Sequence, residues 1–391
     1  MAAQSRARHI LIRLLLLALS IASVFVLLFL VDQQQLRLPA NDFTMYWSSA
    51  KLLLSGANPY DPDGLAEYER QETRDVDPVL MYYPPWSMVW IIPFGLLGHD
   101  ISQVLWLLIQ TAVIFLCTNQ IWLHIGGSKR YRWVAWLAAL IFGPTFAALG
   151  YTGQIAPLLL LGFSYFYINI ERSDKDWLGG LFVLLIGIKP QVYYLFFVIF
   201  ICWALHQRRW RLMISALVTV VLATALSMCF DPLITSHYLQ NLSENAPTAW
   251  ATPAIGTYLR YYLGIGCFEI QFIPAIVTSA LGILFWWKTR KSWNWQESIP
   301  WVLFTSVITT PYTWTYDFLP LIIPLLSGFA WIMPKISLPQ GVILTILYGL
   351  INGAYGWLHL HYSDFNFIWF APVLFIWYIM TNKIADQKIR G

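Results

Sequence analysis

HILIRLLLLALSIASVFVLLFLV, residues 9–31, leads into LPANDFTMYWSSAKLLLSGANPYDPDG, residues 38–64. The apolar run is longer than the roughly 7 to 15 apolar residues of a signal peptide, and no small-residue cleavage site follows it. It is long enough to cross a hydrocarbon core of roughly 30 Å, which takes about 20 helical residues. The two stretches therefore predict a retained membrane span, followed closely by an acidic residue, Asp42, at the membrane boundary.

The composition of the whole chain agrees with a membrane protein. Hydrophobic residues make up 58% of the 391 residues and charged residues only 11%, whereas soluble proteins carry about 25% charged residues. Backbone groups in lipid must be hydrogen-bonded internally, which favours helices, and the alternating segments of about 10 residues typical of membrane barrels are absent. We expect an all-α bundle of about twelve transmembrane helices, forming one polytopic domain over residues 1–391.

The expected spans follow the apolar runs along the chain. Their approximate bounds are 9–31, 102–124, 133–150, 154–171, 178–188, 190–206, 212–230, 271–288, 299–310, 317–334, 338–360 and 365–382. The fifth and sixth meet at Lys189-Pro190, and proline disfavours helical geometry in the residue before it. Non-helical backbone at membrane depth is tolerated where it lines a cavity, so this broken pair predicts a cavity.

The distribution of Lys and Arg predicts the orientation. Arg6 and Arg8 precede the first span, and alternating the loops from there places most basic residues on the same side. By the positive-inside rule, both termini are then cytoplasmic. We expect a multi-pass protein of the plasma membrane, with two long outer segments at residues 32–100 and 231–270.

The first outer segment contains a predicted helix with two different faces. One face is apolar and the other polar, which is typical of a helix lying on a membrane surface. The apolar face comprises Phe43, Tyr46, Trp47, Ala50, Leu53 and Leu54. We therefore expect an interfacial helix on the outer leaflet, with Gly56 as its stop. A further apolar stretch at residues 85–98 carries Pro93 and predicts a surface or re-entrant helix.

Ionisable residues near the outer boundary are candidates for function because membrane spans rarely tolerate them. Asp42 is either a helix N-cap or a general base that removes a proton from an acceptor hydroxyl. Lys189 needs a partner, either a carboxylate or a phosphate, because a cation facing lipid costs at least ~2.5 kcal/mol. Arg260 suits a phosphate, or else it is a solvated or headgroup-facing loop residue. Asp317 could pair with Lys189, act as a second acid or bind a sugar hydroxyl.

Neutral polar and aromatic residues gather at the same predicted depth. Gln154 and Gln191 could bind a substrate or satisfy a helix end. Tyr83 and Tyr316 belong to a group of aromatic residues near the outer boundary, which form either the aromatic belt at headgroup level or a platform for sugar rings and a lipid tail.

Known cofactor and nucleotide motifs are missing. The sequence holds no Walker motif, HExxH, CxxC pair or GxSxG elbow, which argues against a cytosolic nucleotide motor or a metalloprotease. The four cysteines have no metal-ligand spacing. We expect no metal, no other cofactor and no nucleic-acid partner.

Five motifs together resemble glycosyltransferase family 87, whose members are integral-membrane enzymes of the GT-C class. They are NDFTMYWSSAKLLLSGANPYDP, YYPPWSMVWIIPFGLL, GYTGQIAPLLLLG, GIKPQVYYLFF and TTPYTWTYDFLPLIIP, within roughly residues 40–330. The resemblance implies transfer of a sugar, with mannose as the expected one, from a polyprenyl-phosphate donor to a lipid-linked or polysaccharide acceptor on the outer face. Membrane lipids would surround both substrates.

The resemblance also implies roles for individual residues. The GT-C class places its catalytic base in the first outer loop, which maps onto Asp42. Lys189 and Arg260 would hold the donor phosphate, without a divalent metal. Tyr83, Gln154, Gln191, Tyr316 and Asp317 are expected to contact the substrates. Many relatives carry histidine where this chain has Tyr316 and Asp317, so a role of that histidine is not carried over.

Two other functions fit the same sequence. A lipid or glycan transporter or flippase also has broken helices and charges at the midplane, although no inverted repeat is evident. A non-catalytic partner in a glycan assembly machine would tolerate neutralisation of Asp42, Lys189 and Arg260.

Overall fold

The computed structural model describes residues 41–73, 79–263, 267–333 and 339–386. Every regular element in these ranges is a helix, as the composition predicts. The expected first span, residues 9–31, lies outside the described residues.

The α-helices are joined by short 3₁₀ and π turns. Their bounds are α2 (Asn41–Leu54), α3 (Pro62–Thr73), α4 (Ile92–Gly95), α5 (His99–His124), α6 (Arg132–Ile141), α7 (Gly143–Phe146), α8 (Ala156–Asn169), α9 (Asp176–Ile186), α10 (Tyr194–His206), α11 (Trp210–Met228), α12 (Ile234–Glu244), α13 (Ile255–Tyr262), α14 (Ile273–Thr289), α15 (Trp295–Thr309), α16 (Ile322–Ile332), α17 (Pro339–His359) and α18 (Phe370–Asp386).

The expected count of twelve membrane-crossing helices is not confirmed by the part of the chain that the structure describes. Within the described residues, six helices are long and apolar enough to cross a membrane, or seven if the pair 129–141 and 143–150, bent by 64°, is one span. Helices α8, α9, α10 and α15 have only 14, 11, 13 and 15 residues. Each is shorter than the about 20 residues that a full crossing takes. The expected break at Lys189 is confirmed, because α9 ends at Ile186 and α10 begins at Tyr194.

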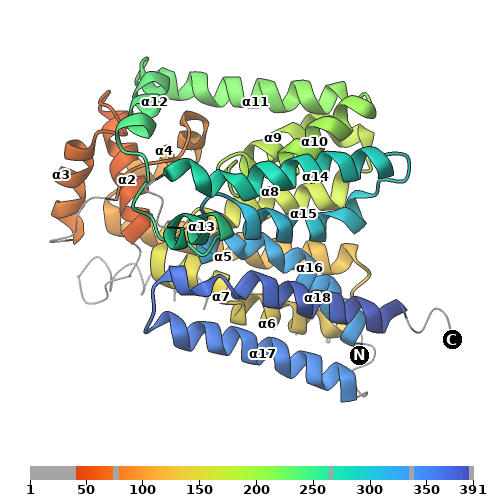
Figure 1. Ribbon diagram of the computed structural model, residues 1–391. Coiled ribbons are helices and arrows are strands. Elements are labelled where there is room, and N and C mark those ends of the chain that lie inside the picture. The colour runs from red at the N-terminus through yellow and green to blue at the C-terminus, as the bar shows by residue number, and fades with distance from the viewer. Residues whose placement is uncertain (1–40, 74–78, 264–266, 334–338, 387–391) are drawn as a thin grey trace, which may run out of the picture.

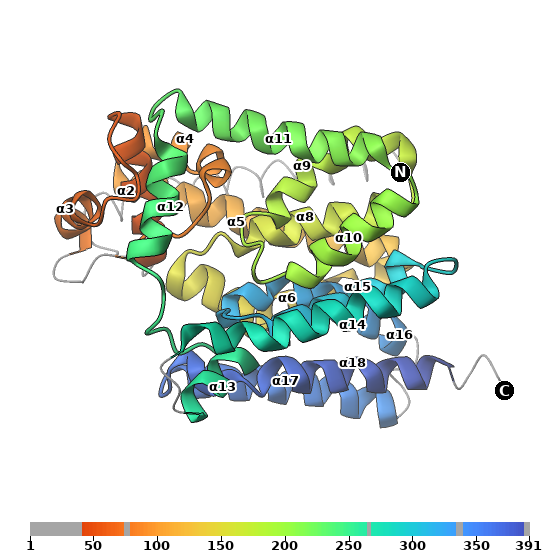
Figure 2. The ribbon, with the colours of Figure 1, turned by 45° about the horizontal axis from the view of Figure 1, so that its top comes forward.

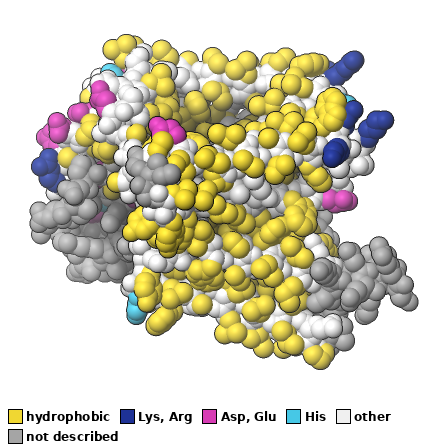
Figure 3. All heavy atoms as spheres, in the orientation of Figure 1, with side chains coloured by type: hydrophobic (Ala, Val, Ile, Leu, Met, Phe, Trp, Pro, Cys, Tyr) yellow, Lys and Arg dark blue, Asp and Glu magenta, His cyan; other side chains and the backbone are white. Residues whose placement is uncertain are grey.

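The helices form an elongated bundle with a polar end. Helix α11 lies along one edge and α17 with α18 along the opposite edge, in both views (Figures 1 and 2). Helices α2, α3 and α12 gather at one end of the bundle (Figures 1 and 2). On the face shown in Figure 3, hydrophobic side chains cover the surface between the ends, with most of the visible acidic side chains at the α3 end and most of the visible basic ones at the other. This surface fits a bundle embedded in lipid.

Helix α2 differs from the expected interfacial helix. The polar face expected from the sequence comprises Thr44, Ser48, Lys51 and Ser55. Thr44 and Ser48 are buried, like every residue from 43 to 50, so this half of the polar face is not turned to water as expected. The reason is that α3, α4 and α5 enclose α2. Thr44 of the polar face bonds to the ring of His99 at 3.0 Å. The stop at Gly56 is confirmed, because Gly56 has φ +76°, which favours glycine.

The two expected outer segments contact each other. Asn241 of α12 donates to the carbonyl of Met81 at 2.9 Å, and the Tyr82 hydroxyl donates to the carbonyl of Asn245 at 2.8 Å. Segment 79–83 is thereby joined to the end of α12, and both segments border the cavity described next.

Candidate functional site

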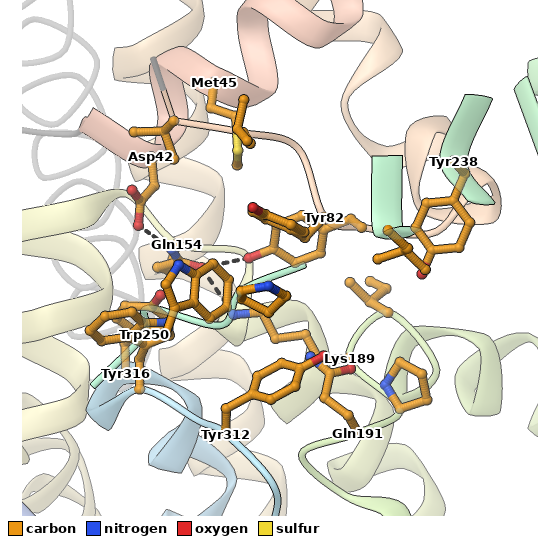
Figure 4. A pocket seen from close by; sticks show the side chains of 18 residues that line it. Asp42, Met45, Tyr82, Gln154, Lys189, Gln191, Tyr238, Trp250, Tyr312 and Tyr316 are labelled. Atoms are coloured by element: carbon orange, nitrogen blue, oxygen red, sulfur yellow. Dashed lines mark hydrogen bonds between the residues drawn. The ribbon is translucent and has the colours of Figure 1, made fainter. Parts of the chain in front are cut away.

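A cavity of about 600 Å³ opens at this end of the bundle. Such a volume is typical of a small-molecule or cofactor site. Its lining combines one carboxylate, one ammonium group and many aromatic rings (Figure 4). The lining includes Asp42, Met45, Tyr82, Tyr83, Gln154, Lys189, Gln191, Tyr238, Trp250, Tyr312, Trp314 and Tyr316.

Local backbone geometry delivers two of these side chains. The π-helical turn 147–152 ends at Gly153, whose φ of +66° is readily adopted by glycine, and the sharp turn places Gln154 before α8. The indole of Trp106 donates to the Gly153 carbonyl at 2.7 Å and fixes this turn. Lys189 lies in the non-helical stretch between α9 and α10. Both polar residues therefore come from breaks in helices rather than from helix faces.

Gln154 connects the carboxylate to the ammonium group. Its Nε2 donates to Oδ2 of Asp42, and its Oε1 accepts from the Lys189 ammonium at 3.4 Å. The hydroxyls of Tyr46 and Tyr83 lie 2.9 and 3.0 Å from the same oxygen. Because three donors surround Oε1, the amide orientation is set by its surroundings. Gln154 lies between Asp42 and Lys189 (Figure 4).

Lys189 forms a buried ion pair with Asp317. Its Nζ lies 2.6 Å from Oδ1 of Asp317, and the two side chains are only 7% and 2% exposed. The other oxygen of Asp317 accepts from the backbone N–H of Trp314 at 3.1 Å. The rings of Tyr83 and Tyr316 lie 5.1 and 4.7 Å from Nζ, which adds cation–π stabilisation. The cation is thus held in place at the cavity wall.

The environment of Asp42 makes its carboxyl group a weaker acid than usual. Burial raises the pKa of Asp42 to about 6, although the Gln154 hydrogen bond and the Lys189 charge oppose the rise and the Asp317 charge adds to it. Asp42 belongs to the first turn of α2 as described, and Gln154 rather than the backbone is its observed hydrogen-bond donor. Of the two roles open from the sequence, this contact does not support the N-cap.

The structure brings most of the predicted residues together. Asp42, Tyr83, Gln154, Lys189, Gln191 and Tyr316 all line the cavity. Asp317 is buried behind Lys189, so of its three predicted roles pairing with Lys189 is the one observed.

Arg260 does not line the cavity, contrary to the expectation of a phosphate ligand. Its guanidinium donates to the carbonyls of Thr248 and Trp250, the latter at 2.5 Å. The charge is used to hold the loop that carries Trp250, whose ring lies 5.0 Å from that of Tyr82. The sequence could not show this, because a guanidinium suits backbone carbonyls as well as phosphates.

Several residues at the site were not singled out by the sequence. Trp250 and Tyr238 line the cavity, yet neither belongs to a motif with a clear signal. Glu69 is buried and accepts from the N–H of Val79 at 3.1 Å, which supports the wall beside the cavity. Burial raises the pKa of Glu69 to about 7. Asp364 lines a second cavity that also includes Asp42. The sequence offered a signal for it, since it is an acid between two apolar runs.

The arrangement can perform two tasks at one place. A carboxyl group with a pKa near neutrality can accept a proton, and a buried ammonium group can hold an anion. Aromatic rings around them can pack against apolar faces. A reaction that transfers a group to a hydroxyl and releases an anionic leaving group requires both of these functions.

Comparison with protein families gives one match. The profile of glycosyltransferase family 87 matches residues 82–315, more than half of the chain, and this range contains Gln154 and Lys189 but not Asp42. No curated protein and no solved structure matches the chain. The matched length shows that the chain belongs to glycosyltransferase family 87.

Proposed function

We propose that this glycosyltransferase inverts the anomeric centre of its sugar and takes that sugar, mannose, from a polyprenyl-phosphate donor. The acceptor is a lipid-linked or polysaccharide glycan at the outer face of the plasma membrane. The observation that carries the proposal is the connection of Asp42 to Lys189 through one amide at the wall of the 600 Å³ cavity.

Asp42 acts as the general base in this proposal. Its carboxylate takes the proton of an acceptor hydroxyl while that oxygen forms a bond to C1 of the sugar. The bond from C1 to the phosphate oxygen breaks with its electron pair going to the phosphate, through a transition state with oxocarbenium character. Polyprenyl phosphate leaves as an anion and needs no general acid.

Lys189 stabilises the charge that grows on the leaving phosphate. An ammonium group has three N–H donors, and Asp317 and Gln154 receive two of them. The third is available to a phosphate oxygen in the cavity, where low polarity strengthens the interaction. The pairing with Asp317 holds the ammonium group at the cavity wall before the donor binds.

The orientation of the protein is part of the proposal. Most of the Lys and Arg side chains visible in Figure 3 lie at the end of the bundle opposite to α3, and basic loops stay in the cytoplasm. The cavity then faces outward, where a lipid-linked donor with its sugar outside is accessible.

The test is sugar transfer by the purified full chain in lipid nanodiscs, with polyprenyl-phosphate mannose as donor and membranes from a deletion strain as acceptor. Asp42→Asn keeps an oxygen that can accept from Gln154 but removes the base. We expect a loss of about 10²-fold or more in turnover, with donor binding unchanged. Asp63→Asn is the matched control, because Asp63 is an exposed acid on α3 outside the cavity lining.

Two results would overturn the proposal. The first is full transfer activity in Asp42→Asn. The second is movement of a lipid or glycan across vesicles without sugar transfer, which would favour a transporter. Analysis of lipid-linked glycans in the deletion strain would identify the acceptor by the truncated species that accumulates.

A further inference from the structure

A second, smaller cavity lies on the other side of Asp42. It has a volume of about 320 Å³ and shares Asp42, Trp314 and Tyr316 with the larger one. The rings of Trp314 and Tyr316 are stacked, with an interplanar angle of 21°, and form a common wall. The π-helical turn 147–152 and the connection between α17 and α18 complete its lining. A base that borders two chambers can serve a reaction between two substrates.

We propose that this smaller cavity binds the acceptor and selects one whose terminal sugar is uncharged. The inference rests on the proposed function, since it assigns the acceptor of the same reaction. In this inference, the two cavities differ in the charge of the substrate that each one binds. The larger holds the anionic donor beside Lys189, and the smaller holds a neutral, hydroxyl-rich ring.

Asp364 carries this selectivity. Its two oxygens accept from the backbone N–H and the hydroxyl of Thr315 at 2.8 and 2.7 Å. A carboxylate has about four lone-pair positions, so Asp364 retains capacity to accept hydrogen bonds from sugar hydroxyls. Its side chain is 9% exposed, and at such burial the charge is weakly screened.

The charge of the smaller cavity disfavours an anionic acceptor. Its described lining contains the carboxylates of Asp42 and Asp364 and neither lysine nor arginine. His359 lies 3.7 Å from Asp364. Even with His359 protonated, that pair is neutral and Asp42 keeps the cavity negative. A phosphate or uronic acid placed here would meet a like charge, which costs affinity.

The aromatic wall suits a sugar ring as well. Trp314 and Tyr316 offer flat apolar surfaces to the C–H face of a pyranose. Asp364 accepts hydrogen bonds from the hydroxyl groups of the same ring. An acceptor hydroxyl bound between them lies next to Asp42, the base of the proposed reaction.

The experiment compares two ligands that differ in one carboxylate. Octyl β-D-glucoside and octyl β-D-glucuronide, each below its micelle concentration, are titrated into the full chain in zwitterionic nanodiscs without donor. We expect the neutral glycoside to bind at least about 10-fold more tightly, a difference of about 1.4 kcal/mol. Binding in the larger cavity would weaken or reverse this preference, because Lys189 lines that cavity together with Asp42.

Two variants locate the preference. Asp364→Asn removes the charge, and Ser363→Lys adds a cation at an exposed lining position that leaves Asp364 and its bonds to Thr315 unchanged. Both should reduce the preference to less than about 3-fold. Thermal unfolding checks the fold of Asp364→Asn, since Asp364 also holds Thr315. Equal binding of the two glycosides, or a preference that neither variant changes, would refute the inference.

The outcome separates this inference from the proposed function. A preference that depends on Asp364, without sugar transfer from the polyprenyl-phosphate donor, supports the binding site and refutes the proposed reaction. Sugar transfer to the glucuronide as efficient as to the glucoside supports the reaction and refutes the neutral-acceptor site. If both hold, Asp364→Asn raises KM for the glucoside while KM for the donor stays unchanged.

Discussion

At the scale of single residues, the pKa of Asp42 sets the acid limb of activity. Because the base works only when ionised and burial raises its pKa to about 6, kcat/KM should fall about 10-fold per pH unit below pH 6. Above pH 7 the carboxylate is ionised and the rate should level off. A pH profile of sugar transfer by the reconstituted protein measures this directly.

Glu69 provides the control for that profile. Its pKa is raised to about 7, and it holds Val79 at the cavity wall. Glu69→Gln removes this titration but leaves Asp42 intact, so the limb near pH 6 should remain. If the acid limb moves in Glu69→Gln, the limb reports the titration of Glu69 and not that of Asp42.

The Lys189–Asp317 pair predicts a stability effect that differs from its effect on activity. Lys189→Met leaves Asp317 buried without its cation, and breaking such a pair costs about 3–5 kcal/mol. Adding Asp317→Asn removes the uncompensated charge and keeps an acceptor for Trp314, so thermal stability should largely return. Transfer activity should stay low in the double variant, since the phosphate would still lack its cation. Recovery of both properties together would show that Lys189 is purely structural.

Sequence reasoning found the individual polar residues better than their roles. Asp42, Gln154 and Lys189 were recognisable because polar groups in apolar surroundings require a partner or a function. The use of Arg260 was not, because its partners are carbonyl groups of residues 248 and 250. Backbone acceptors leave no mark in a sequence.

At the scale of elements, Gly180 decides how closely α9 and α11 pack. A Cβ atom added at Gly180 would lie 2.4 Å from the backbone nitrogen of Ala216, so no side-chain movement relieves the contact. Gly180→Ala should lower stability by about 1–3 kcal/mol. Gly349→Ala on α17 is the matched control, because nothing lies within 4 Å of its added Cβ. Thermal unfolding of both variants in detergent compares them, and equal effects would contradict the packing argument.

The elements show where sequence patterns are informative. The break at Lys189-Pro190 was predictable because proline restricts the residue before it. The burial of α2 was not predictable, although the division of its residues into a polar and an apolar face was correct. A polar face with Thr44 and Ser48 can face water or a polar interior, and the sequence does not show that α5 brings His99 to it.

At the scale of the whole molecule, the proposed orientation predicts accessibility. A cysteine replacing Asp63 should react in intact cells with a membrane-impermeant maleimide, because the α3 end faces outward in the proposal. A cysteine replacing Lys291 should react only after the membrane is opened. The natural cysteines supply the background, which the unsubstituted protein measures. The reverse pattern would place the cavity on the cytoplasmic side and exclude an outer-face reaction.

The class of the bundle could be predicted, but its number of spans could not. Apolar composition and the cost of unsatisfied backbone groups in lipid determine an all-helical protein. The span count depends on helix ends, and several apolar runs fold as helices of 11 to 15 residues. Such short helices are possible because other parts of the bundle bury the ends of the helices, as at Lys189. This burial depends on tertiary contacts, which the sequence does not show.

The amide of Gln154 has one more consequence for the proposed reaction. It separates the carboxylate from the ammonium group, donating to the first and accepting from the second, and a carboxamide is a poor proton wire because passing a proton along it demands an unstable imidic acid tautomer. The proton that Asp42 accepts in each turnover is therefore not passed through Gln154 to Lys189. It must leave Asp42 for water in one of the two cavities that this residue lines before another turnover begins, so the proposed reaction depends on hydration of those cavities between turnovers.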